Sequence, residues 1–421
     1  MKEIDTKPSL DAVIRIPGSK SVTHRSLITA ALAEGESRLD CFLACEDTIY
    51  TLNALQQMGV EIDREGEIVK VKGTGGRLDT ASSRKEIFLG NAGTSYRLLL
   101  SIAALARGEH IFTGIERMKE RPIKDLVQAL VDLGVEAGYT EKEGYPPVII
   151  NASGIRGGKV AIPGDKSSQY FSSLLLAGPY AEKDVEIEVV GELVSRPYID
   201  VTLDVMNDFG VPVDRDDYRY FKVPAGKYYI ARNYTIDGDV SSASYFWGAA
   251  AITKGRVITE NIHAEKTRQG DIALLGVLEE MGCKVIRESD RVILEGQELS
   301  AIDIDMSGMP DMVPTLAAIA LFARGTTFIR NVAHLRIKES DRLSVVAQEL
   351  GRIGGLVMEK KDGLVIQGKG KLSGAIISPH GDHRIAMSLA MAGLAVPGIM
   401  IEDEDCVAKS FPGFWDSLEA L

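Results

Sequence analysis

Turns, apolar helical stretches and alternating stretches follow one another in a fixed order along the whole chain. After the turn at Gly18, residues 19–34 are mostly small and apolar, which predicts a buried helix. Residues 48–58 carry apolar side chains at helical spacing and end at Gly59, and residues 60–71 alternate as two strands around a second turn. This order predicts a subdomain of strand, helix, strand, helix and hairpin.

The turn that opens this subdomain recurs at intervals of 71 to 74 residues. The residue after each turn is Ser, Asn or Asp, and each of these side chains can accept from the free backbone N–H groups of a first helical turn. The period is longer than that of solenoids and propellers, so each repeat is expected to be a small α/β unit. The six pairs are Gly18-Ser19, Gly90-Asn91, Gly164-Asp165, Gly238-Asp239, Pro310-Asp311 and Gly381-Asp382.

The sixth unit is shorter than the others, because the chain ends at Leu421 after one short helix. A strand predicted at residues 12–16 is expected to complete it. One domain would then contain residues 1–18 and 238–421 (units four to six), and the other residues 19–237 (units one to three). Two chain crossings would join the domains and allow a hinge motion.

Composition and length favour a soluble globular protein with a large core. The chain has 421 residues, of which 45% are hydrophobic and 26% charged, enough for a large core. Its longest apolar runs, such as residues 389–396, are shorter than a bilayer span, and the N-terminal segment has no signal-peptide core. We therefore expect a cytoplasmic protein without a membrane partner.

Cysteine number and net charge exclude further classes. The four cysteines are too scattered for a disulfide framework and lack zinc spacing, so no structural metal is expected. A net charge of −12 argues against nucleic acid as a partner. An anionic substrate would have to be held by a local cluster of cations.

Such cations recur at the starts of units and in the loops. Taken singly, each has a simpler explanation: the turn around Lys20 lacks P-loop spacing, and a charged run usually forms a solvated face. Together they predict a site for a ligand with several anionic groups, held between two domains, in which Asp311 and Glu339 could transfer protons. The cations are Lys20, Arg25, Arg117, Lys338, Arg342, Arg384 and Lys409.

An ordered set of motifs over the full length resembles the 5-enolpyruvylshikimate 3-phosphate synthases, members of the enolpyruvyl transferases. The motifs are GSKSxxxR, GNAGT, RMKERP, SSQY, SRPY, GDxSSASYF, PD, RIKESDRL, GDHRIAM and AKSFP. The resemblance implies an α/β fold, the two-domain inverse α/β barrel of six βαβαββ units, with helix N-termini directed at the cleft. It also implies transfer of the enolpyruvyl group of phosphoenolpyruvate to the 5-hydroxyl of shikimate 3-phosphate, without a cofactor, by a monomer.

The same resemblance assigns the site residues. It implies that Asp311, Glu339 and Lys20 are catalytic. Shikimate 3-phosphate would be bound by Lys20, Ser21, Arg25, Ser167, Ser168, Gln169, Ser195, Asp311, His334 and Lys338. Phosphoenolpyruvate would be bound by Lys20, Gly93, Arg117, Gln169, Arg342, Arg384 and Lys409.

Two positions depart from the pattern of some family members: His334 stands where they have asparagine, and Leu98 where they have proline. Three alternatives fit the sequence less well than this family. The transferase that acts on UDP-N-acetylglucosamine has a loop cysteine without a counterpart near Arg117. A non-catalytic anion-binding repeat scaffold needs neither Asp311 nor Glu339, and an RNA-end-processing ligase would require a basic surface.

Overall fold

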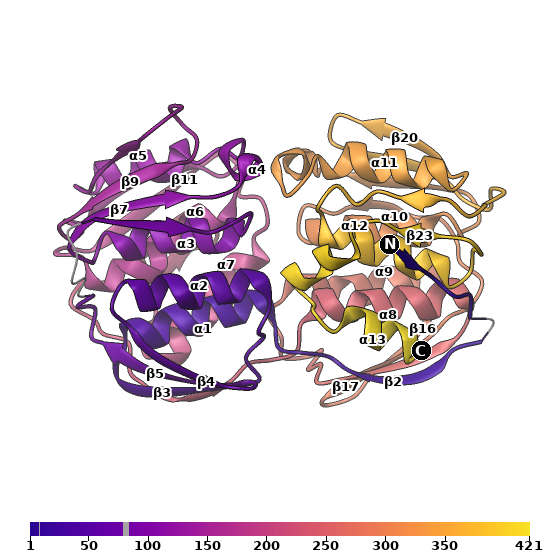
Figure 1. Cartoon of the computed structure of the whole chain (residues 1–421), viewed down its shortest axis with the longest axis horizontal. Helices are drawn as coiled ribbons and strands as arrows, with labels where there is room; N and C mark the ends of the chain where they lie inside the picture. The colour runs from indigo at the N-terminus through magenta and orange to yellow at the C-terminus, as the bar shows by residue number, and fades with distance from the viewer. Residues whose placement is uncertain (8, 79–83) are drawn as a thin grey trace. The chain divides into compact units, whose positions relative to one another are not determined.

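A computed structural model describes residues 1–7, 9–78 and 84–421. The described chain forms two compact units (Figure 1). We call Gly18–Ile236 the inserted unit, and Met1–Pro17 with Asp237–Leu421 the terminal unit, because it holds both chain ends. Within the described ranges, no helix has the length and apolar character needed to cross a membrane.

Each sheet of the inserted unit begins with a parallel pair of strands and ends with an antiparallel hairpin. Within its described residues there are three such sheets, each of four strands. In hydrogen-bonding order they are β14 (Asn233–Thr235), β3 (Glu34–Asp40), β5 (Ile68–Thr74) and β4 (Glu61–Glu65); β6 (Arg84–Phe88), β7 (Gly108–Thr113), β9 (Val148–Ala152) and β8 (Glu136–Tyr139); and β10 (Gly158–Pro163), β11 (Val185–Val190), β13 (Tyr220–Val223) and β12 (Asp214–Asp216).

Over the residues that the structure describes, the terminal unit repeats this strand order in two four-stranded sheets and has a third sheet of three strands, with one antiparallel and one parallel pair. They are β2 (Asp11–Arg15), β15 (Arg256–Glu260), β17 (Arg291–Glu295) and β16 (Lys284–Arg287); β18 (Asp303–Asp305), β19 (Thr326–Arg330), β21 (Gly363–Gln367) and β20 (Leu356–Lys360); and β1 (Lys2–Glu3), β23 (Met400–Ile401) and β22 (Ile376–Ile377).

The position of the N-terminal strand corrects one expectation from the sequence. β2 does not complete the sixth unit: it pairs in parallel with β15, where Val13 lies opposite Ile258 (indigo strand in Figure 1). The last sheet is completed instead by β1, whose Lys2 lies opposite Ile401. The chain passes from one unit to the other directly after β2 and again after β14, so each strand pairs within the unit that it leaves. If each strand paired with the next one along the chain, β2 would lie beside β3 and β14 beside β15. Instead, β2 lies beside β15 and β14 lies beside β3.

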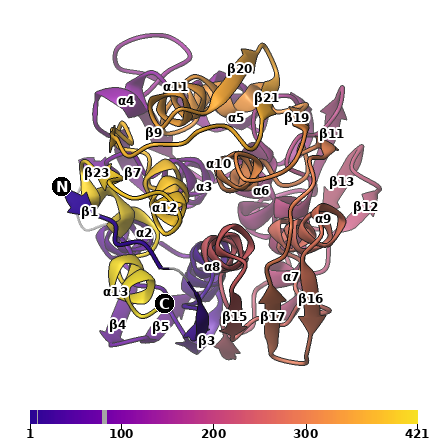
Figure 2. The same ribbon diagram turned by 90° about the vertical axis from the view of Figure 1, so that its right-hand side faces the viewer.

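Helices of two kinds cover these sheets. The inner helices are buried along nearly their whole length, which explains their small and apolar sequences. They are α1 (Lys20–Leu32), α3 (Gly93–Ala103) and α6 (Ser168–Ala177) in the inserted unit, and α8 (Val240–Thr253), α10 (Val313–Ala320) and α12 (His383–Gly393) in the terminal unit. Figure 2 shows α8, α10 and α12 almost end-on, inside the sheets of the terminal unit.

The outer helices bury only one face, and each ends as the sequence predicts, at a glycine before a hairpin. They are α2 (Glu46–Gln57), α5 (Lys124–Asp132), α7 (Pro197–Asp208), α9 (Leu274–Met281) and α11 (Arg342–Arg352). The glycines that follow them, Gly59, Gly134, Gly210, Gly282 and Gly354, all have positive φ, which a residue with a Cβ rarely adopts. The shorter helices are α4 (Glu116–Lys119), α13 (Phe414–Glu419), and the 3-10 turns Gly178–Tyr180, Gly270–Ala273, Pro310–Met312, Ala333–Ile337 and Glu404–Lys409.

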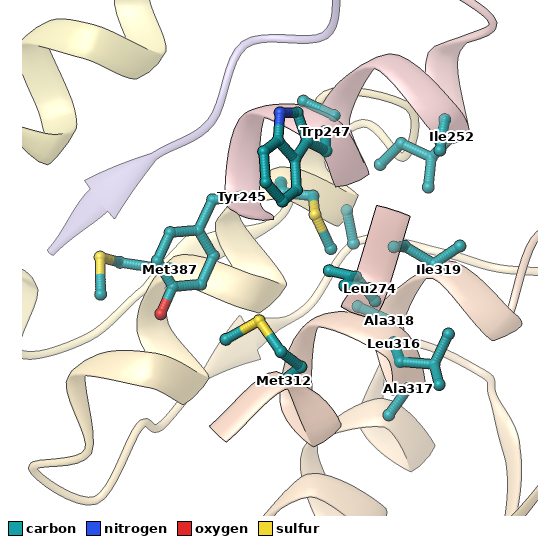
Figure 3. Close-up of a cluster of buried hydrophobic side chains, with 14 of the residues drawn as sticks. Tyr245, Trp247, Ile252, Leu274, Met312, Leu316, Ala317, Ala318, Ile319 and Met387 are labelled. Atoms are coloured by element: carbon teal, nitrogen blue, oxygen red, sulfur yellow. The ribbon is translucent and has the colours of Figure 1, made fainter. Parts of the chain in front are cut away.

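The core of the terminal unit lies where the inner helices meet. Figure 3 shows Trp247 of α8, Leu274 of α9, Ile319 of α10 and Met387 of α12 packed in one cluster. Trp247 is fully buried, and its indole N–H donates to Thr259 Oγ1 at 2.9 Å. The polar atom of this large core side chain is therefore hydrogen-bonded within the protein.

The predicted helix caps are correct at two of the six turns. Asp239 accepts from the Ser242 backbone N–H at 2.8 Å, and Asp382 from that of Arg384 at 3.1 Å. Elsewhere the cap lies at another residue or the polar side chain has another function. Ser19 occupies the N-cap position of α1 without a side-chain cap bond, Ala92 replaces Asn91 at α3, Ser167 replaces Asp165 at α6, and Asp311 lies in a 3-10 turn and accepts from arginines.

Candidate active site

The first turns of four helices meet at one end of the inserted unit. Lys20 Nζ, at the start of α1, lies 3.1 Å from Asp47 Oδ2 in the first turn of α2. The Asp47 backbone carbonyl accepts from Ser95 Oγ of α3 at 2.9 Å. Gln169 of α6 donates to Thr94 Oγ1 of α3, also at 2.9 Å. Because helix N-termini carry free N–H groups and positive partial charge, their convergence favours an anion.

Arg25 is a buried cation surrounded by neutral oxygen atoms. Its guanidinium donates to Thr202 Oγ1 at 2.7 Å, to the Ser21 carbonyl at 2.8 Å and to the Tyr198 carbonyl at 3.2 Å. A longer bond of 3.4 Å reaches Ser172 Oγ. Burial lowers the pKa of Arg25 to about 10. Within the described ranges no carboxylate pairs with Arg25, and because a buried charge without a countercharge is costly, a bound anion would be strongly favoured here.

The predicted binding serines lie at the starts of α6 and α7. Ser167 accepts from the Gln169 backbone N–H at 3.3 Å, and Ser168 is buried beside it. Ser195 has φ of 55°, in the left-handed region that residues with a Cβ seldom adopt. Its side chain is buried, so the surrounding structure holds the serine in this conformation. Such local strain is typical of functional positions.

Gly93 begins α3 and lies against the guanidinium of Arg121. A Cβ atom at position 93 would be 2.5 Å from Arg121 Nη2, closer than any real contact. Arg121 is buried and donates to both the carbonyl and the side-chain oxygen of Asn91 at 3.1 Å. Leu98 is fully buried within the unbroken α3, so this departure leaves the helix that carries Gly93 intact.

Arg117, which the resemblance assigns to phosphoenolpyruvate, lies on the surface. Its side chain is 31% exposed and pairs with Glu120 at 2.7 Å. Arg121, four residues further on, is the arginine that the structure brings against Gly93. Both arginines belong to the RMKERP motif, and nothing in their local sequence distinguishes them. Of the two, Arg121 is the arginine that lies beside Gly93, and Arg117 pairs with Glu120.

In the terminal unit, Arg342 binds three carboxylates. Its guanidinium lies 2.7 Å from Asp382, 2.8 Å from Asp311 and 2.8 Å from Glu339. Burial by itself would lower the pKa of Arg342, but these carboxylates raise it above its usual value. Asp382, expected only as a helix cap, thus also fixes Arg342. The RIKESDRL and GDHRIAM motifs meet through this contact.

Asp311 lies between two arginines. Besides Arg342, it accepts from Arg384 Nη2 at 2.8 Å. Burial favours the neutral carboxyl, but the positive charges of Arg384 and Arg342 outweigh it and hold the pKa of Asp311 well below its usual range. Asp311 is therefore ionised at neutral pH, as an acceptor of protons has to be. Glu339, bound to the same arginine, is its neighbour.

The other predicted residues of this unit surround the pair. His334 is buried, and burial together with the charge of Lys338 lowers its pKa to about 3, so its imidazole is neutral. Lys338 follows the same 3-10 turn and acts electrostatically on Asp311. Lys409 is buried at the end of the last 3-10 turn. Within the described part of the chain, no group of His, Cys, Asp or Glu side chains is arranged to hold a metal ion.

Fold and site together define an α/β protein suited to anionic ligands in each of its two units: the inserted unit gathers helix N-termini and the buried Arg25, and the terminal unit holds the ionised Asp311 among its own arginines. The family model described as EPSP synthase (3-phosphoshikimate 1-carboxyvinyltransferase) matches residues 4–418. The chain belongs to this family and transfers the enolpyruvyl group of phosphoenolpyruvate to shikimate 3-phosphate in the shikimate pathway.

Relatives and solved structures agree over the whole length. A 3-phosphoshikimate 1-carboxyvinyltransferase of Syntrophobacter fumaroxidans is 45% identical over 422 residues, covering 100% of this chain and 99% of the relative. One of Vibrio vulnificus is 43% identical over 426 residues, with the same coverage. The solved EPSP synthase of Acinetobacter baumannii is 31% identical, with a TM-score of 0.82 over 99% of this chain and 97% of that one. The fold class and activity implied by the sequence are thereby confirmed.

Proposed function

We propose that the reaction proceeds by addition and then elimination, through a tetrahedral intermediate, with Asp311, Glu339 and Lys20 as the proton-transfer residues. The observation that carries this proposal is the shared contact of Asp311 and Glu339 with Arg342. Two carboxylates fixed on one guanidinium are close enough to serve the two reacting carbons of one small substrate.

The proposed reaction consists of an addition step and an elimination step. A proton added to C3 of phosphoenolpyruvate makes C2 electron-poor, and the 5-hydroxyl of shikimate 3-phosphate attacks C2 and loses its proton. The intermediate carries a methyl group at the former C3. Loss of phosphate from C2 and of one methyl proton then restores the double bond in the product. No electrons are exchanged with an external oxidant or reductant.

The environments of the two carboxylates suggest their roles. Asp311 is ionised because of its arginine partners, so it suits the base that accepts the proton of the 5-hydroxyl. Glu339 is assigned as the acid toward C3. Phosphoenolpyruvate would add negative charge beside Arg342 and Arg384, and a nearby negative charge favours the protonated form of a carboxyl. The two residues exchange roles in the elimination step.

For shikimate 3-phosphate, the best-supported binding residue is Arg25, whose buried charge has only neutral oxygen partners among the residues that the structure describes. We assign the phosphate to the end of the inserted unit where Arg25 and the helix N-termini lie. The other proposed contacts are Lys20, Ser21, Ser167, Ser168, Gln169 and Ser195 of this unit, with Asp311, His334 and Lys338 of the terminal unit.

For phosphoenolpyruvate, arginines suit both the carboxylate and the phosphate, because a guanidinium can donate two parallel hydrogen bonds. We assign Arg342, Arg384 and Lys409 of the terminal unit, and Arg121 of the inserted unit in place of Arg117. Gly93 would keep the space beside Arg121 open. Lys20 and Gln169 would contact both substrates, so the two units act on the same reactants as two domains.

A reaction run in D₂O tests the intermediate. Because the methyl group rotates, deuterium is expected in the vinyl methylene of the product and, if the steps reverse, in recovered phosphoenolpyruvate. Mass spectrometry of the product measures it, and the same incubation without shikimate 3-phosphate is the control. Product without deuterium at that carbon would exclude the methyl intermediate.

Oligomeric state and location complete the proposal. We propose that the protein is a monomer, because one chain carries all the residues assigned to both substrates. We also propose that it acts in the cytoplasm. Sedimentation equilibrium at the concentration of the activity assay is expected to give the 45.6 kDa mass of one chain. A dimer whose dissociation abolishes turnover would contradict this part.

A further inference from the structure

A buried carboxyl of the terminal unit is left without a function by the roles assigned above. Asp271 lies in the 3-10 turn Gly270–Ala273 and is 4% exposed. Its Oδ2 accepts from the hydroxyl of Ser241, in the first turn of α8. Its Oδ1 is buried and has no hydrogen-bond partner among the described residues. A buried carboxyl with one unpaired oxygen is costly for folding, which suggests that another function retains it.

Ser241 connects this carboxyl to the site. Arg384 Nη2 lies 3.4 Å from Ser241 Oγ and 2.8 Å from Asp311 Oδ2. The serine hydroxyl directs its hydrogen toward Asp271 and presents a lone pair to Arg384. Asp271 therefore orients the hydroxyl that helps to hold one end of the Arg384 guanidinium, while Asp311 accepts from the same Nη2 atom.

The Asp271 carboxyl titrates close to neutral pH. Burial, the negative charge of Asp311 and that of Asp239 raise its pKa, Arg384 and the Ser241 hydrogen bond oppose them, and the resulting pKa is about 7. The carboxyl is thus neutral below this pH and ionised above it. When it is ionised, Arg384 faces a second negative charge in addition to Asp311, and less of its positive charge is available to an incoming anion.

We propose that Asp271 is a positioning residue for phosphoenolpyruvate, which acts on Arg384 through Ser241 and has to be uncharged for tight binding. The inference rests on the proposed contact between Arg384 and phosphoenolpyruvate. It adds to that proposal a residue outside the family motifs quoted above, and it predicts how substrate affinity changes with pH.

The test is the KM for phosphoenolpyruvate of the wild type and of Asp271→Asn, measured from pH 5.5 to pH 8.5. Asparagine keeps the shape of the neutral carboxyl and cannot ionise. The ratio of wild-type KM to variant KM is expected to be near one at the acid end and to rise about tenfold at the alkaline end, with a much smaller change in kcat. Asp303→Asn, an exposed carboxylate paired with Arg330 in the same unit, is the matched control and should give a flat ratio.

A second measurement without substrate controls for folding. The folded pKa of Asp271 is above the value of about 3.9 in an unfolded chain, so the wild type loses stability as pH rises through 7. The variant does not, and its Tm relative to wild type should increase between pH 5.5 and pH 8.5. A Tm difference that is constant with pH would contradict the titration of Asp271.

The variant Arg384→Lys distinguishes a failure of this inference from a failure of the proposed contact between Arg384 and phosphoenolpyruvate. If Arg384→Lys raises the KM for phosphoenolpyruvate and the Asp271→Asn ratio is flat, the inference is wrong and the Arg384 contact stands. If neither variant changes this KM, the contact of Arg384 is wrong, and the inference with it.

Discussion

Gly93 and Arg121 are packed so closely that a single methyl group at position 93 would lie 2.5 Å from the guanidinium. Gly93→Ala therefore has to displace Arg121 from its bonds to Asn91. We expect the affinity for phosphoenolpyruvate and for its analogue glyphosate to fall by about fivefold or more, because forcing an extra methyl into a packed site costs about 1 kcal/mol or more. Shikimate 3-phosphate should be affected less.

Isothermal titration of each ligand measures this difference. Gly276→Ala, where a Cβ would meet nothing within 4 Å, is the control for adding a methyl group to a helix. Equal weakening of both substrates by Gly93→Ala would contradict the place of Gly93 in the phosphoenolpyruvate site.

Arg121 and Arg117 provide a matched pair of substitutions to alanine. Arg121 is buried and makes charge-assisted hydrogen bonds, so its loss should raise the KM for phosphoenolpyruvate by about tenfold or more. Arg117 forms an exposed pair with Glu120, which contributes little, and its loss should change this KM by less than about threefold. Steady-state kinetics of the two variants decides between them, and a larger effect at Arg117 would restore the assignment from the sequence.

Asp311→Asn and Glu339→Gln should each lower kcat by about 10²-fold or more, the usual result of losing a positioned acid or base. Their effects on substrate affinity should be smaller, because the amide side chains can still accept from Arg342. Single-turnover experiments measure the chemical step. Asp303→Asn, on the surface of the same unit, is the control, and near-normal turnover in both variants would remove these residues from the mechanism.

Arg25→Met tests whether the buried cation holds shikimate 3-phosphate. Because burial already lowers the pKa of Arg25 to about 10, its charge destabilises the unliganded fold and should be compensated by the bound phosphate. Saturating shikimate 3-phosphate is expected to raise the Tm of the wild type and to have much less effect on the variant. An equal shift in both proteins would show that the phosphate binds elsewhere.

Closure of the two units is a further expectation. Residues of both units are assigned to the same small ligands, and only two stretches of chain, near Pro17 and Ile236, connect them. Shikimate 3-phosphate should therefore decrease the radius of gyration measured by small-angle scattering. Shikimate without its phosphate is the control, and an unchanged radius would contradict a hinge motion.

Much of the fold could be predicted from local pattern. Helix, glycine and hairpin follow each other in sequence, so the pattern correctly predicts the turn at Gly59 and the two strands after it. The ordered motifs were sufficient to identify the family and the reaction. These features depend on residues close together in the chain, where periodicity and turn chemistry act directly.

Tertiary structure decided the rest. The pattern of residues 12–16 predicts a strand, which the structure has at Asp11–Arg15, but its partner β15 depends on where the chain crosses between units. Arg117 and Arg121 have the same side chain in one motif, and only packing against Gly93 distinguishes them. Asp271 belongs to none of the motifs. Its pKa follows from burial and from the charge of Asp311, which is 40 residues away in sequence. The burial of a residue and the electrostatic field that acts on it depend on its neighbours in space, and these neighbours are set only when the chain folds.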